Sequence, residues 1–106
     1  MKNVTIDFNK GDGLVPAIIQ DYKSGVVYML GYMNKEALDK TRKTGCVYFW
    51  SRSRKKLWLK GETSGNKLQV QQIFFDCDKD ALLIKCQLMG KNACHTGQKS
   101  CFHVKL

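Results

Sequence analysis

The segment DCDKD, residues 76–80, carries three carboxylates at alternate positions. In an extended backbone successive side chains point to opposite faces, so Asp76, Asp78 and Asp80 would share one side. Cys77 would then face the other side. Three converging carboxylates repel one another unless a cation neutralises them, and ligand sets made only of oxygen suit Mg²⁺ or Ca²⁺. The spacing therefore predicts a divalent-cation site, and the alternative is a solvated acidic turn between two strands.

Three cysteines have the chemistry of ligands for a softer metal. Cys94 and Cys101 flank the loop CHTGQKSC, and Cys77 lies within the acidic segment. The spacing is not the tight CxxC of a zinc finger, but three thiolates brought together can form a zinc site with an open fourth position. An open position is typical of catalytic zinc. The alternative is that one or more of these cysteines only pack, as we expect of Cys46 and Cys86 within apolar strands.

Two histidines lie close to these cysteines in the sequence. His95 directly follows Cys94, and it has three possible roles: a fourth metal ligand, a general base, or a loop residue bonded to backbone. His103 comes two residues after Cys101, so in a strand it would face the same side. For His103 the sequence favours a structural role.

Residues 50–66, WSRSRKKLWLKGETSGN, combine positive charge, hydroxyl groups and aromatic rings. Five cations fall within nine residues, at positions 52–60. Arg and Lys beside hydroxyls and a turn containing Gly are natural phosphate ligands, and Trp50 and Trp58 could stack on a purine. The same composition fits a nucleic-acid surface, or a solvated hairpin with two core tryptophans. The candidate substrate-binding residues are Trp50, Ser51, Arg52, Ser53, Arg54, Lys60, Glu62, Thr63, Ser64 and Asn66.

Size, charge and cysteine count limit the class of protein. The chain has 106 residues, which predicts a single domain over residues 1–106. Its 18 Lys and Arg against 9 Asp and Glu give a net charge of +9, which favours an anionic partner, either nucleic acid or a phosphorylated small substrate. Five cysteines without a secretory signal indicate a reducing compartment, and no run approaches a membrane span. We therefore expect a cytoplasmic protein without a membrane partner.

These residues need strands and one helix to position them. The segment 26–30 predicts a strand, and a helix is expected over Lys35–Lys43, with Asn34 as its N-cap and Gly45 at its C-terminal cap. Residues 62–66 read as a turn and 89–100 as a loop. Further strands are expected over 46–51, 57–60, 68–76 and 81–88, and residues 101–106 are expected to close the sheet. The pattern predicts an α+β fold with a largely antiparallel sheet.

Three of these segments together resemble the signatures of the phosphoribosyl-AMP cyclohydrolase family. They are WSRSRKKLWLKGETSGN (50–66), FDCDKDALLIK (75–85) and CHTGQKSCF (94–102), and residues 14–38 are similar to the opening segment of that family. One departure is visible, because Gly90-Lys91-Asn92-Ala93 replaces a shorter Gly-Pro stretch before the cysteine. The departure concerns the rigidity of the loop more than its ligands.

The resemblance implies an intertwined homodimer with one zinc and one magnesium per subunit. Asp76, Asp78 and Asp80 match the magnesium ligands of the family. The zinc ligands match Cys77, Cys94 and Cys101, with Cys77 given by one subunit and the later pair by the other.

The implied reaction is hydrolysis of the N1–C6 bond of N1-(5-phosphoribosyl)-AMP, a step of histidine biosynthesis. A ribosyl group on N1 makes C6 electron-poor and open to attack by water, and His95 is our candidate for handling the proton. The implied partner is a phosphorylated nucleotide, with no nucleic acid. The alternatives are a zinc-stabilised nucleic-acid-binding module and a hydrolase of another purine nucleotide. Because the chain ends at Leu106, we expect no second catalytic activity from a following domain.

Overall fold

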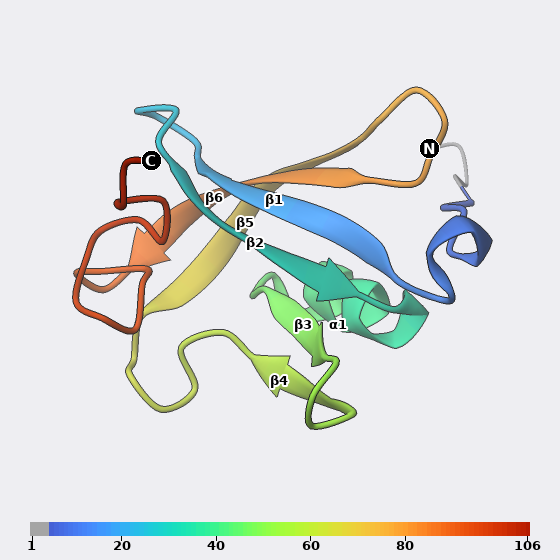
Figure 1. The fold of residues 1–106 in the computed structure, drawn as a ribbon, viewed down its shortest axis with the longest axis horizontal. Helices are drawn as coiled ribbons and strands as arrows, with labels where there is room; N and C mark the ends of the chain where they lie inside the picture. The colour runs from blue at the N-terminus through green and yellow to red at the C-terminus, as the bar shows by residue number, and fades with distance from the viewer. Residues whose placement is uncertain (1–4) are drawn as a thin grey trace.

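The computed structural model describes residues 5–106 and contains two β-sheets and one α-helix (Figure 1). The larger sheet has the strand order β2-β1-β6-β5, and the smaller sheet pairs β3 with β4. Only β1 and β6 run parallel among these pairs, which confirms the predicted α+β class with mostly antiparallel pairing. The elements are η1 (Asn9–Gly11), β1 (Val15–Asp21), β2 (Val27–Met33), α1 (Lys35–Thr44), β3 (Tyr48–Ser51), β4 (Lys56–Leu59), β5 (Lys67–Phe75) and β6 (Leu82–Met89).

The core lies between one face of the larger sheet and the layer formed by α1 and β3 (Figure 1). Along β1 the side chains alternate, so Ala17 and Ile19 are fully buried while Ile18 between them is exposed. Phe49 of β3 packs directly against Gly31 of β2, where an added Cβ would lie 2.5 Å from two ring carbons. The absence of a side chain at Gly31 thus brings the two sheets close together.

The helix follows its sequence signals closely. The Asn34 side chain accepts a hydrogen bond from the backbone of Ala37 at 2.8 Å, and Gly45 adopts the left-handed conformation at the end. Thr41 is fully buried, and its hydroxyl accepts a hydrogen bond from the Tyr48 backbone N–H at 2.9 Å. The helix is therefore capped at both ends and fixed to the start of β3. Across residues 5–106 no helix is long and apolar enough to cross a membrane.

Three details of the sequence-based fold are wrong. The strand β1 is missing from the sequence-based prediction, and it contains Pro16, which lacks the N–H that a central strand uses in pairing. In the structure the pairing of β1 with β6 begins only at Ala17, so Pro16 has a partner on one side alone, at Tyr32 of β2. The expected strand over residues 101–106 is absent: these residues are exposed and irregular. Their alternating apolar residues, Phe102, Val104 and Leu106, remain exposed and pair with no strand of this chain.

The third error concerns the DCDKD segment, which is a turn and not an extended strand. It joins β5 to β6, and Lys79 has a positive φ of 63°. The strands β4, β5 and β6 lie within one residue of their expected bounds, whereas β2 continues three residues further, to Met33, and β3 begins two residues later, at Tyr48. Residues 1–4 lie outside the described residues. The prediction of a domain over residues 1–106 and the expectation that no secretory signal is present both include them.

Candidate functional site

A cleft of about 480 Å³ opens where the loop after β6 meets the segments around β4. One wall comes from the ends of β3 and β4 and the turn that follows β4. The other wall includes His95, from a loop some thirty residues further along the chain. The residues that line the cleft are Ser51, Arg54, Trp58, Leu59, Lys60, Gly61, Glu62, Thr63, Ser64 and His95.

Lys60 is the most buried cation of this cleft. Only 9% of the residue is exposed, whereas Arg54 at the rim is exposed. The Lys60 backbone N–H donates to the Val47 carbonyl at 3.1 Å, which holds the end of β4 against the core. Trp58 packs its ring 5.3 Å from that of buried Phe49 and turns another part of its surface to the cleft. The cleft thus has a fixed aromatic wall and a lysine held within it.

The structure gathers six of the ten predicted substrate-binding residues around the cleft and leaves four outside its lining. Those within it are Ser51, Arg54, Lys60, Glu62, Thr63 and Ser64. Trp50, Ser53, Arg52 and Asn66 do not line it. Three of these have other side-chain contacts: the Arg52 guanidinium lies 4.0 Å from the centre of the Tyr32 ring, and the Ser53 hydroxyl lies 3.4 Å from that of Ser51. The Asn66 side chain accepts a hydrogen bond from the Lys91 backbone N–H.

The loop that carries His95 brings two predicted zinc ligands together. The sulfur of Cys94 lies 3.0 Å from the Thr96 hydroxyl, and hydrogen bonding to Thr96 holds the pKa of the Cys94 thiol below its usual range. Desolvation and the neighbouring Cys94 raise the pKa of Cys101. His103 approaches the Thr96 hydroxyl at 3.5 Å. Two interacting thiols of unequal acidity are suitable ligands for a thiophilic metal.

This loop is fixed at its exit by the strand β2. The Ser100 hydroxyl donates to the Val27 carbonyl at 2.6 Å, and the backbone N–H of Cys101 donates to the Tyr28 carbonyl at 2.7 Å. Neither Ser100 nor Tyr28 was singled out from the sequence. These contacts join residues more than seventy positions apart, so no local sequence pattern predicts them.

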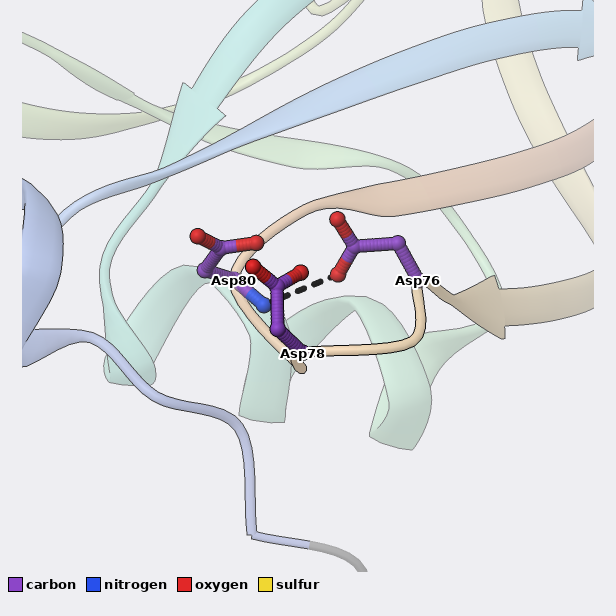
Figure 2. Close-up of side chains that lie close together, drawn as sticks. All are labelled: Asp76, Asp78 and Asp80. Carbon is purple, nitrogen blue, oxygen red and sulfur yellow. Dashed lines mark hydrogen bonds between the residues drawn. The ribbon is translucent and has the colours of Figure 1, made fainter.

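The acidic turn between β5 and β6 brings its three carboxylates together (Figure 2). Ligand atoms of Asp76, Asp78 and Asp80 all lie within 4.8 Å of one another. An oxygen of Asp76 accepts hydrogen bonds from the backbone of Asp80 at 3.0 Å and of Ala81 at 3.2 Å, which closes the turn. The predicted convergence is therefore present, but a tight turn produces it and strand alternation does not.

A lysine beside this cluster offsets part of the repulsion among its carboxylates. Hydrogen bonding from Asp80 lowers the pKa of Asp78, and the same contact raises the pKa of Asp80. The Lys10 ammonium lies 3.4 Å from Asp78 and 3.6 Å from Asp80. A divalent cation fits this oxygen cluster because two positive charges would neutralise the three carboxylates more fully than the single charge of Lys10 does. Lys10, far away in sequence, was not predicted.

Cys77 does not join the other two cysteines within this chain. It lies at the turn before β6, while Cys94 follows the far end of that strand (Figure 1). The eight residues of β6 span roughly 26 Å at the usual rise of a strand. Among residues 5–106 the aspartates form the one group of three or more potential metal ligands within 4.8 Å. Cys94 and Cys101 therefore fit zinc as an incomplete set of ligands.

A cationic, hydroxyl-rich cleft beside paired thiols and a histidine is characteristic of an enzyme that acts on a phosphorylated substrate. Comparison with known proteins agrees. The sequence profile described as Phosphoribosyl-AMP cyclohydrolase matches residues 29–103. The phosphoribosyl-AMP cyclohydrolase of Solibacter usitatus (strain Ellin6076) is 57% identical over 103 residues, 97% of this chain and 82% of the relative. That of Clostridium botulinum (strain 657 / Type Ba4) is 59% identical over 101 residues, 95% of this chain and 91% of the relative.

A third relative is longer. The histidine biosynthesis bifunctional protein HisIE of Thermosynechococcus vestitus (strain NIES-2133 / IAM M-273 / BP-1) is 59% identical over 91 residues, which are 86% of this chain and 42% of that protein. Identity at this level over nearly the whole chain establishes common descent. The chain belongs to the phosphoribosyl-AMP cyclohydrolase family.

Proposed function

We propose that this chain hydrolyses N1-(5-phosphoribosyl)-AMP, opening the adenine ring at the N1–C6 bond in a step of histidine biosynthesis. The observation that carries the proposal is family membership over nearly the whole chain, joined to a cleft lined by His95 and by the cationic and hydroxyl side chains that we propose bind phosphate. The ribosyl group on N1 leaves C6 short of electrons, so water adds there and the N1–C6 bond then breaks. Because a ring is opened, there is one product: C6 becomes a carboxamide, and N1 stays in the same molecule as part of a formamidine.

The cleft supplies groups for the two phosphates of this substrate. Lys60 and Arg54 provide positive charge, and Ser51, Thr63 and Ser64 provide hydroxyl groups. Trp58 offers an aromatic face for the purine. Lys60 and Arg54 contribute to the net charge of +9. Binding of a phosphorylated substrate would thus explain part of this charge without a nucleic-acid partner.

His95 is our candidate for the proton transfers. Its side chain lines the same cleft as the phosphate-binding groups, and its backbone directly follows Cys94. An imidazole at this place can take a proton from the attacking water and return one to N1 as the N1–C6 bond breaks. The proposed base therefore lines the cleft and is adjacent in sequence to a proposed zinc ligand.

Zinc, one per subunit, is proposed to bind Cys94 and Cys101 together with Cys77 of a second copy. The two thiols of one chain already interact, and the third lies beyond their reach at the other end of β6. When bound, zinc would lower the pKa of a water molecule so that it becomes a better nucleophile near neutral pH. Magnesium, also one per subunit, is proposed at Asp76, Asp78 and Asp80.

A homodimer follows from this incomplete site, and the outer face of the larger sheet offers a surface for it. One exposed apolar row crosses four strands, because Ile18 is paired with Leu30 and Leu83, and Leu83 with Phe74. Leu30, Ile18 and Phe74 are 42%, 37% and 44% exposed. A second copy that covers this row would bury apolar side chains from the face opposite the core. We place the dimer in the cytoplasm, where thiols stay reduced.

The deciding experiment measures three quantities on one sample: absorbance change on ring opening of phosphoribosyl-AMP, zinc content and oligomeric state. We expect turnover by a dimer with about one zinc per subunit, and loss of zinc and turnover in Cys94→Ser. A folded, zinc-loaded protein without turnover would refute the substrate assignment. Turnover of AMP itself would indicate a hydrolase of another purine nucleotide. Binding to generic DNA that weakens with salt, in place of turnover, would indicate a nucleic-acid-binding module.

A further inference from the structure

Asn66 connects the turn at the cleft to the loop that carries Cys94 and His95. We infer that Asn66 is a positioning residue for this loop, and that its amide oxygen binds the loop backbone and not the substrate. The inference rests on the proposed function, because it concerns the zinc ligands and base assigned there. It differs from the role that the sequence motif suggests, which is contact with the substrate.

The contact between Asn66 and the loop is close. The Asn66 Oδ1 atom accepts a hydrogen bond from the Lys91 backbone N–H at 3.1 Å, across twenty-five positions of sequence. Gly90 lies so near that a Cβ there would overlap Oδ1 and would lie 2.9 Å from the Asn66 Cα and 3.0 Å from its Cγ. Gly90 also has a φ of 157°. A side chain at position 90 would therefore displace Asn66.

On its other side Asn66 is fixed to the turn that lines the cleft. The Asn66 backbone N–H donates to the Ser64 hydroxyl at 3.2 Å. Gly61 has a positive φ of 87°, and a Cβ there would lie 2.5 Å from the carbonyl carbon and oxygen of Asn66. Gly61 and Ser64 both line the cleft. Asn66 is thus held between the cleft turn and the loop entry.

The loop itself is a small, internally bonded unit. Ala93 and Cys94 donate backbone hydrogen bonds to the carbonyls of Lys99 and Gln98, and Gly97 donates to Cys94, each at 3.1 Å. Its exit is fixed to β2 through Ser100 and Cys101. Since the unit is closed internally, its orientation depends on where its two ends are attached. The Asn66 contact is the attachment at its entry, so it helps to set where the Cys94 sulfur and the His95 ring lie.

The residue at position 91 makes this contact possible. Lysine carries a backbone N–H, which proline lacks, so a proline there would leave the Asn66 oxygen without this donor. The chain therefore fixes the entry of the loop by a hydrogen bond to a side chain. The Lys91 side chain is exposed and takes no part in the hydrogen bond.

The test compares three variants: Asn66→Ala, which removes the acceptor; Asn66→Asp, which keeps an oxygen there; and Lys91→Ala, which keeps the backbone N–H. Zinc affinity is measured by competition with a chromogenic chelator, and hydrogen exchange of the Lys91 amide is measured on the metal-free protein. The kcat and KM are measured on the zinc-loaded enzyme. Thermal unfolding shows whether each variant is folded.

For Asn66→Ala we expect faster exchange at Lys91, zinc affinity lower by about 10-fold or more, and a fall in kcat with KM nearly unchanged. Asn66→Asp should restore zinc affinity and amide protection, and Lys91→Ala should match the wild type. A rise in KM with zinc affinity and amide exchange unchanged would overturn the inference, since Asn66 would then be a substrate contact. If the wild type neither binds zinc nor turns over, the proposed function fails, and amide exchange alone decides whether Asn66 holds the loop.

Discussion

At the scale of single residues, the chemistry depends on a few polar atoms held by hydrogen bonds. The Thr96 hydroxyl contacts the Cys94 sulfur, and His95 between them in sequence turns to the cleft. The Cys94 thiol and the His95 imidazole are therefore side chains of adjacent residues with different surroundings. The turn that carries them would separate the side of the loop proposed to bind zinc from the side proposed to meet the substrate.

Replacement of His95 by alanine tests its assignment as the base. We expect His95→Ala to lower turnover by about 10²-fold or more while zinc content stays at the wild-type level. Gln98→Ala, which changes an exposed side chain of the same loop, is the matched control and should leave turnover near that of the wild type. Unchanged turnover in His95→Ala would remove this histidine from the mechanism.

A second prediction at the scale of residues concerns Asp21, at the end of β1. Its carboxylate accepts hydrogen bonds from the Ser24 backbone at 2.7 Å and from the Tyr28 hydroxyl at 2.8 Å. The Ser24 backbone contact, opposed by desolvation and helped by the Tyr28 hydroxyl, lowers the pKa of Asp21 to about 2 from its ordinary 3.8. The folded state therefore prefers the ionised form, and this preference stabilises it above pH 3.8.

The stabilisation is lost as the pH falls through the folded pKa of about 2. We expect Asp21→Asn to lower the free energy of unfolding at pH 6, and the gap from the wild type to shrink as the pH approaches 2. Urea unfolding at a series of pH values measures this gap. A gap of constant size across the series would show that ionisation of Asp21 does not contribute.

At the scale of elements, the site depends on how closely the smaller sheet approaches the larger one. The strands β3 and β4 carry Ser51 and Trp58 to the cleft, and they reach that place by packing Phe49 over Gly31. Phe49 is only 1% exposed, so its ring has no space to move away. The cleft wall is therefore built on this contact between β2 and β3.

We expect Gly31→Ala to destabilise the fold by about 1–3 kcal/mol, because the new Cβ would overlap the Phe49 ring. Gly11→Ala is the control, since a Cβ at Gly11 has no neighbouring atom within 4 Å. Denaturant unfolding of both variants measures the difference. Equal stabilities of the two variants would mean that β2 and β3 can separate at little cost.

At the scale of the whole molecule, the separation of Cys77 from Cys94 and Cys101 would make activity depend on assembly if the proposed zinc site is shared between two subunits. The two ends of β6 hold different parts of the proposed zinc site. In a symmetric dimer each part meets its complement on the other subunit, so two complete sites form together. The exposed row through Ile18 and the exposed side chains of Phe102, Val104 and Leu106 are among the apolar surfaces that such an assembly could cover.

Mixed dimers test this arrangement. Cys77→Ser and Cys94→Ser should each be inactive alone, but a refolded equal mixture should recover about a quarter of wild-type activity, because each mixed dimer holds one intact site. A mixture of Cys94→Ser with Cys101→Ser is the control and should stay inactive, since every site then lacks a ligand. No recovery in the first mixture, despite exchange of subunits, would show that the site is not shared.

The sequence alone determined the features that depend on neighbouring residues. The caps of α1 at Asn34 and Gly45, and the hairpin of β5 and β6 around the acidic turn, all follow from local propensities. The family motifs, too, can be read directly. These features are predictable because the interactions that form them connect residues a few positions apart.

Contacts between groups far apart in the sequence could be seen only in the folded structure. It placed Lys10 beside the aspartates, Ser100 on β2 and Asn66 against Lys91, and it made β1 a central strand despite Pro16. Each of these contacts depends on the register of the strands and on the space left by glycines distant in sequence. Neither can be predicted from the residues on either side of a position. The apolar residues after Cys101 show the same limit, because an alternating pattern becomes a strand only where a partner surface exists to bury it.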